Sequence, residues 1–229
     1  KNKRLIKLLN EQVEMREKNS FIENKVKSDE EKIINILRTN GYYFSKVIPK
    51  LKNNPNNTVD LIFEIELGDK AYIKKIRFIG DKKIKENKLK KIIISEEAKF
   101  WKFVSSRKFL DLNRINLDEK LLYNYYRNKG YYNVSVESSS AKVIDESNFE
   151  LIFNINAGNK YYFGNIDLIL PEDYSQESFK KIIEVQNSLE GKIYSLDKIK
   201  QILNKIDEIA LTKEFEFINA KYQEEIVDN

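Results

Sequence analysis

A Gly-Tyr-Tyr triplet followed by two β-rich segments occurs twice in this chain, with the copies about 90 residues apart. The first copy begins at Gly41 and the second at Gly130. Each continues through a Leu-Ile-Phe-x-Ile segment and closes with Gly-x-Lys-x-Tyr. Self-similarity at a fixed spacing indicates tandem structural units. The fold of one unit therefore constrains most of the chain.

The composition agrees with small folded units. Of the 229 residues, 41% are hydrophobic, 12% aromatic and 34% charged, which is typical of globular and not of disordered chains. The net charge of +5 comes mainly from lysines dispersed among acidic residues. It is weak evidence for a polyanion partner, and a basic RNA-binding α+β module is the alternative that it leaves open.

The middle unit, residues 71–159, has the clearest pattern. A strand over 72–79 is followed by a short amphipathic helix and by a second helix that begins near Asn113 or Asn116 and ends at Gly130. Two strands follow, over 131–143 and 149–157. The first helix is predicted from Ile84, Leu89, Ile92 and Ile93, and the apolar face of the second from Leu117, Leu121, Leu122, Tyr125 and Tyr126.

The order β-α-α-β-β predicts an α+β module, in which two helices cover one face of a three-stranded mixed sheet. Residues 1–70 fit the same order without its first strand, with helices near 4–15 and 28–39 and strands over 42–51 and 59–67. Residues 160–229 fit it without its last strand, with strands over 161–170 and near 215–222 and helices over 175–185 and 196–211. Since a two-stranded remnant is only marginally stable, we interpret the chain as part of a longer array.

The residue types argue against an enzyme. The chain contains no Cys and no His, and we find no motif for a nucleophile, a phosphate loop or a metal. We therefore predict no catalytic, cofactor-binding or metal-binding residues. The pair Glu96-Glu97 is interpreted as a solvated helix end, and Asp111, Asp118 and Glu119 as favourable charges near a helix N-terminus.

The aromatic residues invite a recognition role, but core packing is the simpler interpretation. Alternation along a strand predicts that one tyrosine of each Gly-Tyr-Tyr pair points inward. Trp101 is the only tryptophan and lies among Phe100, Phe103 and Val104. A plug at one end of the core is favoured over an exposed anchor for its indole.

These motifs resemble the POTRA (polypeptide-transport-associated) domains of the Omp85 family, most of all those of its outer-membrane protein assembly factors, the BamA branch. The resemblance is carried by the β-α-α-β-β order, the helix-ending Gly-Tyr-Tyr, the Leu-Ile-Phe-x-Ile strand and the Gly-x-Lys-x-Tyr junction. It is most specific over 99–165, which resembles a third POTRA domain; 1–70 and 161–229 would then be most of a second and a fourth. Lys213-Glu214-Phe215 replaces Gly-Tyr-Tyr in the last copy, so that helix exit differs.

The resemblance implies a periplasmic scaffold attached to the outer membrane, without enzymatic activity, cofactor or nucleic-acid partner. Its expected partners are unfolded outer-membrane proteins, accessory assembly lipoproteins and the protein's own C-terminal membrane barrel, which is absent from this chain. The alternative within the family is another Omp85 relative, such as a translocation and assembly module protein or a two-partner secretion transporter.

The resemblance also places strand 131–143 at a sheet edge. The unpaired N–H and C=O groups of an edge strand can add a strand from an extended peptide, which is called β-augmentation. Polar side chains here would limit aggregation. The predicted binding residues are Tyr132, Asn133, Val134, Ser135, Val136, Glu137, Ser138, Ser139 and Ser140.

Overall fold

The computed structural model describes residues 3–17, 19–101, 105–171, 174–212 and 219–227, with only the backbone for 138–141. The chain divides into two compact units. One comprises Lys1–Ile79, Ile84–Glu119 and Glu137–Asn154, and the other comprises Gly80–Lys83, Lys120–Val136 and Ile155–Asn229. The middle repeat contributes to both units, so each repeat is described by itself.

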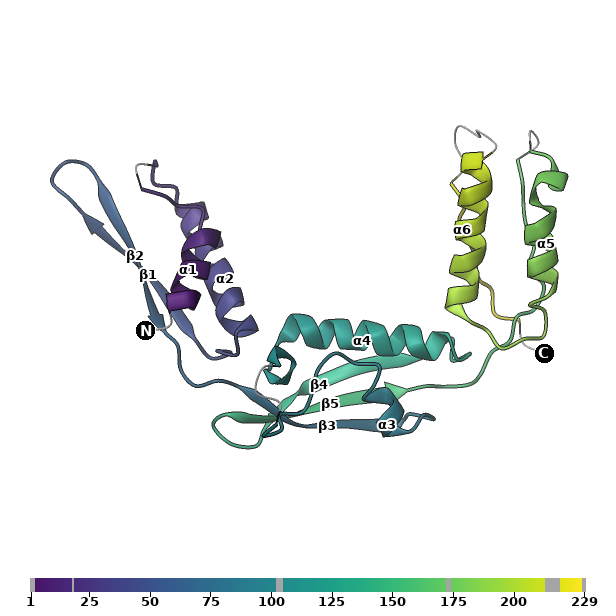
Figure 1. Cartoon of the computed structure of the whole chain (residues 1–229), viewed down its shortest axis with the longest axis horizontal. Coiled ribbons are helices and arrows are strands. Elements are labelled where there is room, and N and C mark those ends of the chain that lie inside the picture. Colours follow the sequence, from purple (N-terminus) through teal and green to yellow (C-terminus); the bar gives the residue numbers. More distant parts are fainter. Residues whose placement is uncertain (1–2, 18, 102–104, 172–173, 213–218, 228–229) are drawn as a thin grey trace. The chain divides into compact units, whose positions relative to one another are not determined.

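The first repeat is a helix pair on a hairpin. Helices α1 (Lys3–Gln12) and α2 (Glu23–Thr39) lie on the same side of the antiparallel hairpin of β1 (Lys46–Asn53) and β2 (Val59–Glu66) (Figure 1). All four elements were predicted, but α2 begins five residues before its predicted start and β1 begins four residues after. The core that joins helices to hairpin consists of Leu5, Leu9, Ile33, Leu37 and Val47, with Phe63 and Ile65 packed against it.

The middle repeat has the predicted α+β order. It consists of β3 (Tyr72–Asp81), α3 (Glu86–Leu89), the short 3₁₀ helix η1 (Ser106–Lys108), α4 (Leu112–Arg127), β4 (Ser135–Val143) and β5 (Asn148–Asn156). The strands form one sheet in the order β3-β5-β4. Helix α4 runs along one face of this sheet (Figure 1).

Both helices of the middle repeat differ from the prediction. Helix α3 has only four residues, and tight turns follow it, with Ile92 N donating to Leu89 O. The β-branched run after Lys91 disfavours a longer helix. In α4, Leu122 and Tyr126 are buried as predicted, but Leu117 is exposed. The buried stripe is Ile115, Asp118, Leu122 and Tyr126, which includes a carboxylate that an apolar pattern does not detect.

The predicted core position of Trp101 is wrong. Its side chain is 58% exposed and that of Phe100 is 80% exposed. The buried apolar residues on either side of this loop are Ile93 and Leu110, so smaller side chains fill the core where the indole was expected. Phe103 and Val104 lie outside the described residues.

The last repeat contains the two predicted helices. α5 (Lys180–Asn187) is preceded by the short 3₁₀ helix η2 (Gln176–Phe179) and packs beside α6 (Leu196–Thr212) (Figure 1). The strand predicted over 161–170 does not form within the described residues: Tyr162 makes an isolated bridge with Ile193, its neighbours Tyr161 and Phe163 bond to residues 191–194, and 164–170 lie in no strand. Of the strand predicted near 215–222, residues 215–218 lie outside the described part and 219–222 form no strand.

Candidate functional site

The two edges of the β3-β5-β4 sheet differ in whether other segments hydrogen-bond to them. The outer edge of β3 is bonded near its start: Ile73 O accepts a hydrogen bond from Ala98 N at 2.7 Å, and Ala71 O, just before the strand, accepts one from Leu110 N at 3.0 Å. Further along the strand, Ile76 N donates to the Glu97 carboxylate at 3.0 Å. The first half of this edge is therefore engaged and less available to another strand.

The outer edge of β4 is open. In the part of the chain that the structure describes, β4 ends the sheet, and no segment outside the sheet pairs with it. Ser135 and Glu137 are exposed, Val136 is half-buried and Val134 is buried, as expected for alternation along a strand. For Ser138, Ser139 and Ser140 the structure places the backbone in β4 and describes no side chain.

The equivalent strand of the first repeat is β1, which also follows a Gly-Tyr-Tyr triplet. It contains Pro49 and the lysines Lys46, Lys50 and Lys52. Proline has no N–H and is tolerated in a sheet where the missing donor faces outward. Proline and lysine are common on edges that resist pairing. The sequence of β4 has no proline, so of these two strands only β4 keeps all of its N–H donors.

Three residues of the predicted edge lie outside β4. The strand begins at Ser135 and not at residue 131, so the buried Val134 and also Tyr132 and Asn133 precede it. The Asn133 amide donates to Tyr161 Oη at 2.8 Å. The Tyr132 ring lies 5.2 Å from the ring of Tyr194 and 4.4 Å from the guanidinium of Arg127. Tyr132 and Asn133 therefore belong to the joint with the last repeat.

The Gly-Tyr-Tyr triplet forms a joint with the same geometry in both copies. In the first joint, Gly41 has a φ of +97°, and its carbonyl accepts a hydrogen bond from Ala71 N at 2.9 Å. Tyr72 forms a bridge with Phe109. A Cβ atom on Gly41 would lie 2.9 Å from the Phe109 ring, so only glycine fits here.

In the second joint, Gly130 has a φ of +92°, and its carbonyl accepts a hydrogen bond from Tyr161 N at 2.8 Å. Tyr162 forms a bridge with Ile193. A Cβ atom on Gly130 would lie 2.7 Å from Ile193 Cγ2. The triplet thus connects consecutive repeats. As predicted, one tyrosine of each pair packs against a core: Tyr42 against that of the first repeat and Tyr132 against that of the last repeat. All four tyrosines are half-buried and precede the strands, so alternation along a strand is not the reason.

A buried polar network surrounds Arg127 at the second joint. Its guanidinium donates to the Glu224 carboxylate at 2.7 Å and to Tyr194 Oη. Tyr194 in turn donates to Glu224 at 2.6 Å. Burial and the hydrogen bond to Glu224 raise the pKa of Tyr194, which keeps its hydroxyl a donor. The network ties α4 to the approach to α6 and to the segment after residue 218.

Sequence reasoning missed Arg127, although a signal was present. An arginine stands three residues before the glycine in both copies, Arg38 and Arg127. Each guanidinium lies over the ring of the second tyrosine, at 5.3 Å for Tyr43 and 4.4 Å for Tyr132. The repeated motif is therefore Arg-x-x-Gly-Tyr-Tyr.

The carboxylates considered from the sequence have structural roles. Asp111 caps α4 by accepting a hydrogen bond from Arg114 N at 3.1 Å, as a charge at a helix N-terminus should. Asp118 instead lies buried and accepts hydrogen bonds from Ile94 N at 2.5 Å and Ser95 N at 3.2 Å. Burial raises the pKa of Asp118 against the opposing effect of these bonds.

The prediction that Glu96 and Glu97 form a solvated helix end is wrong, because neither residue lies in a helix. Burial favours the neutral form of Glu97, but hydrogen bonds from Lys90 at 2.6 Å and from Ile76 N outweigh it and lower its pKa. Glu96 lies 3.5 Å from Arg107. The two carboxylates serve separate partners.

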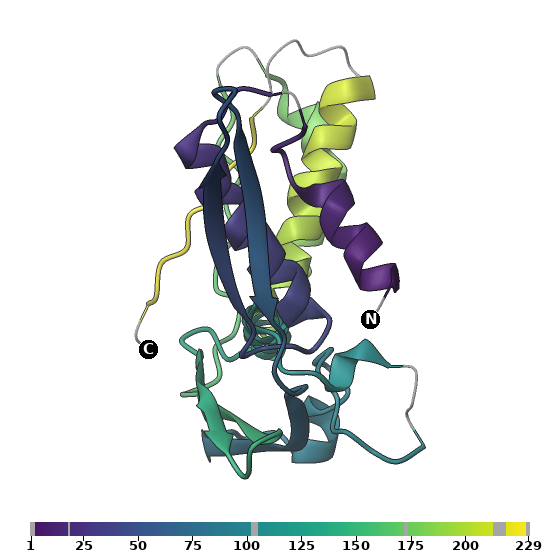
Figure 2. The ribbon, with the colours of Figure 1, turned by 90° about the vertical axis from the view of Figure 1, so that its left-hand side faces the viewer.

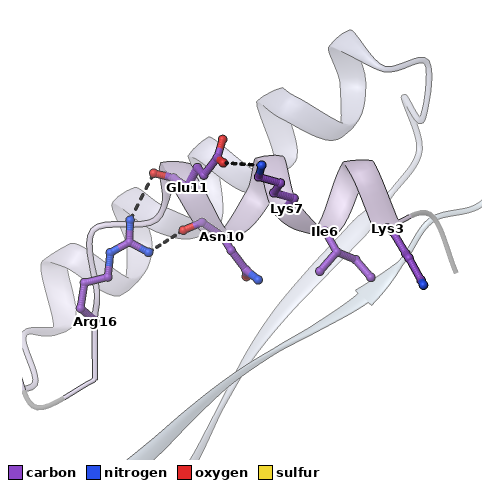
Figure 3. Close-up of a pocket in the computed structure, with 6 residues that line it drawn as sticks. All are labelled: Lys3, Ile6, Lys7, Asn10, Glu11 and Arg16. Atoms are coloured by element: carbon purple, nitrogen blue, oxygen red, sulfur yellow. Dashed lines mark hydrogen bonds and ion pairs between the residues drawn. The ribbon is translucent and has the colours of Figure 1, made fainter.

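An open depression of about 450 Å³ lies along α1 and is lined by Lys3, Ile6, Lys7, Asn10, Glu11 and Arg16 (Figure 3). Arg16 donates to the carbonyl oxygens of Asn10 and Glu11, a favourable interaction for a cation at a helix C-terminus. Lys7 lies 3.9 Å from Glu11. These polar groups pair with one another and stabilise the helix end.

Within the described ranges, no group of three or more Asp or Glu side chains could hold a metal ion. The described helices include none with the length and apolar character needed to cross a bilayer.

The family model and the curated relatives point to the same protein family. The family model for POTRA, described as a surface antigen variable number repeat, matches residues 6–68 and 71–158. The outer membrane protein assembly factor BamA of Neorickettsia risticii is 20% identical over 72% of the chain and 23% of its own length. That of Nitratidesulfovibrio vulgaris is 26% identical over 60% of the chain and 17% of its own length. The chain thus spans about a fifth of these relatives' length.

A solved structure shares the fold. The crystal structure of POTRA domains 3–5 of BamA from Haemophilus influenzae superposes with a TM-score of 0.55, at 15% identity, and the match covers 93% of this chain and 82% of that one.

Proposed function

Because this chain belongs to the POTRA family, we propose that it is the periplasmic scaffold region of an outer-membrane protein assembly factor, and that the outer edge of β4 binds extended segments of unfolded outer-membrane proteins. In the full-length protein, the other proposed partners are accessory assembly lipoproteins and the protein's own membrane barrel. The chain acts by binding and carries out no chemistry.

The observation that carries the proposal is the contrast between the two sheet edges. Ala98 and Leu110 bond the start of the β3 edge, whereas no described segment pairs with the outer edge of β4. An open edge recognises an extended peptide through main-chain hydrogen bonds, so it accepts many sequences. The exposed Ser135 and Glu137 keep the edge polar, which favours reversible binding over aggregation. These properties suit a receptor for varied unfolded clients.

Proline substitutions in β4 test this site. Neighbouring N–H groups on a strand point in opposite directions, so of Val136→Pro and Glu137→Pro one removes a donor from the open edge and the other removes one from the ladder. Amide exchange identifies the outward N–H beforehand. The outward variant should stay folded and bind a labelled β-barrel-strand peptide at least about tenfold more weakly, since it loses one main-chain bond and gains a steric block.

The matched controls are Ser135→Ala and Glu137→Gln, which keep the main chain intact. Both should bind within about twofold of the parent chain, because the backbone and not the side chains makes the contact. A folded outward proline variant with unchanged affinity would remove β4 as the binding edge.

The first repeat offers the reverse test. Replacing Pro49 by serine restores an N–H to β1, so Pro49→Ser should add amide protection over residues 46–53 when peptide is present. Hydrogen exchange with and without the peptide measures this gain. If β1 stays unprotected while β4 becomes protected, proline is not what distinguishes the two edges.

A further inference from the structure

A pair of aromatic rings projects from the loop between α3 and η1. Phe100 is 80% exposed and Trp101 is 58% exposed. Their rings meet edge to face at 4.5 Å, and Lys99 Nζ lies 5.5 Å from the Trp101 ring. We call Lys99, Phe100 and Trp101 the aromatic tip. Exposed apolar surface of this size is unfavourable in water and indicates an interaction site.

The base of the aromatic tip is held in place. Ala98 N donates to Ile73 O at 2.7 Å, and Glu96 N donates to Arg107 O at 3.0 Å. The second bond joins the two ends of the loop. Figure 2 shows the described chain after α3 running out beside the sheet. The two rings therefore follow directly on residues that are bonded to the sheet and to Arg107.

The charge around the aromatic tip is basic. From Ala98 to Lys108 the sequence contains no Asp or Glu. The carboxylates before it are engaged, since Glu96 lies 3.5 Å from Arg107 and Glu97 lies 2.6 Å from Lys90. Tryptophan and phenylalanine beside lysine are the residue types that partition into the headgroup region of bilayers, and basic residues favour anionic lipid.

We propose that the aromatic tip inserts into the interfacial region of an anionic phospholipid bilayer. The chemistry of the tip favours a bilayer. Phe100 is exposed over four-fifths of its surface, and an indole and a phenyl ring beside a lysine suit the interface of an anionic bilayer, which needs no complementary pocket. The site is separate from the open edge of β4, because this loop is bonded to the opposite edge of the sheet.

Trp101 reports directly on this binding, because it is the only tryptophan. The chain is titrated with vesicles of phosphatidylcholine containing about one-third phosphatidylglycerol. Tryptophan emission should shift to shorter wavelength and be quenched by brominated acyl chains. Binding should weaken at high salt and on pure phosphatidylcholine, because the lysine contribution is electrostatic.

Variants that keep Trp101 separate the apolar contribution to vesicle binding from the electrostatic one. Phe100→Ser should lower the partition coefficient about tenfold. This is the effect expected when the lipid covers about half of the apolar surface of the phenylalanine side chain. Lys99→Glu should lower it on anionic vesicles and have little effect on pure phosphatidylcholine. The matched control is Ile169→Ser, which removes an apolar side chain that is 92% exposed elsewhere and should bind like the parent chain.

Three results would overturn the proposal. The first is the absence of an emission shift on any vesicle with a chain shown to be folded by circular dichroism. The second is a Phe100→Ser variant that partitions like the parent chain. The third is a shift produced by an unfolded outer-membrane polypeptide and not by vesicles, which would assign the aromatic tip to a protein partner.

Discussion

Replacing Arg127 by methionine should lower the free energy of unfolding by about 3 kcal/mol, because it leaves a mostly buried carboxylate without its cation. The side chains of Arg127 and Glu224 are only 10% and 17% exposed, so water cannot fully replace the lost pair. Tyr194 would also lose the hydrogen bond that Arg127 donates to it. Urea unfolding followed by circular dichroism measures the change.

The repeat supplies a matched control for Arg127. Arg38 holds the same position before Gly41 and lies over Tyr43, but no ion pair to it is found among the described residues. Arg38→Met should therefore cost about 1 kcal/mol or less, mainly from the lost cation–π contact. In the double variant Arg127→Met, Glu224→Gln, part of the loss should return, because the unpaired charge is gone. Equal losses for Arg38→Met and Arg127→Met would contradict the network's role.

Replacing Gly130 by alanine should cost about 2–4 kcal/mol, through backbone strain at positive φ and overpacking. The new Cβ would lie 2.7 Å from Ile193 Cγ2 and 3.2 Å from Tyr161 O. Since the backbone oxygen cannot move without breaking the joint, the clash should loosen the Gly130 carbonyl bond to Tyr161 N. Urea unfolding and amide exchange at Tyr161 measure both effects.

A substitution at Gly158 measures the cost of backbone strain without a steric clash. Its φ is +66°, and an added Cβ would meet nothing within 4 Å, so Gly158→Ala should cost only the strain of about 1–2 kcal/mol. Adding Ile193→Ala to Gly130→Ala should recover part of the difference. If the losses at Gly130 and Gly158 are equal, close packing is not the reason for glycine at the joint.

Both joints connect consecutive repeats of the proposed scaffold. Each glycine carbonyl accepts a hydrogen bond from the residue that opens the next repeat, so each joint is built from main-chain contacts and a glycine that admits no side chain. The second joint adds the Arg127 network. The position equivalent to Tyr194 in the first joint is Leu110, which has no hydroxyl, so the two joints differ in how they are stabilised.

The repeat, most of the helices and the β-α-α-β-β order of the middle unit could be predicted from the order of residues alone. These features depend on patterns between near neighbours: apolar spacing in α4 and α6, alternation in β5 and glycines at helix ends. Where such local signals conflict, as in the β-branched run that shortens α3, the prediction failed at the boundary.

The bonding of the sheet edges, the position of Trp101 and the partner of Arg127 depend instead on contacts between distant parts of the folded chain. Ala98 and Leu110 bond the start of the β3 edge while Trp101 stays outside the core, and Arg127 meets Glu224 at a separation of 97 residues. Local patterns do not encode these contacts. They form because buried polar groups must find partners wherever folding brings surfaces together, and that depends on the whole chain.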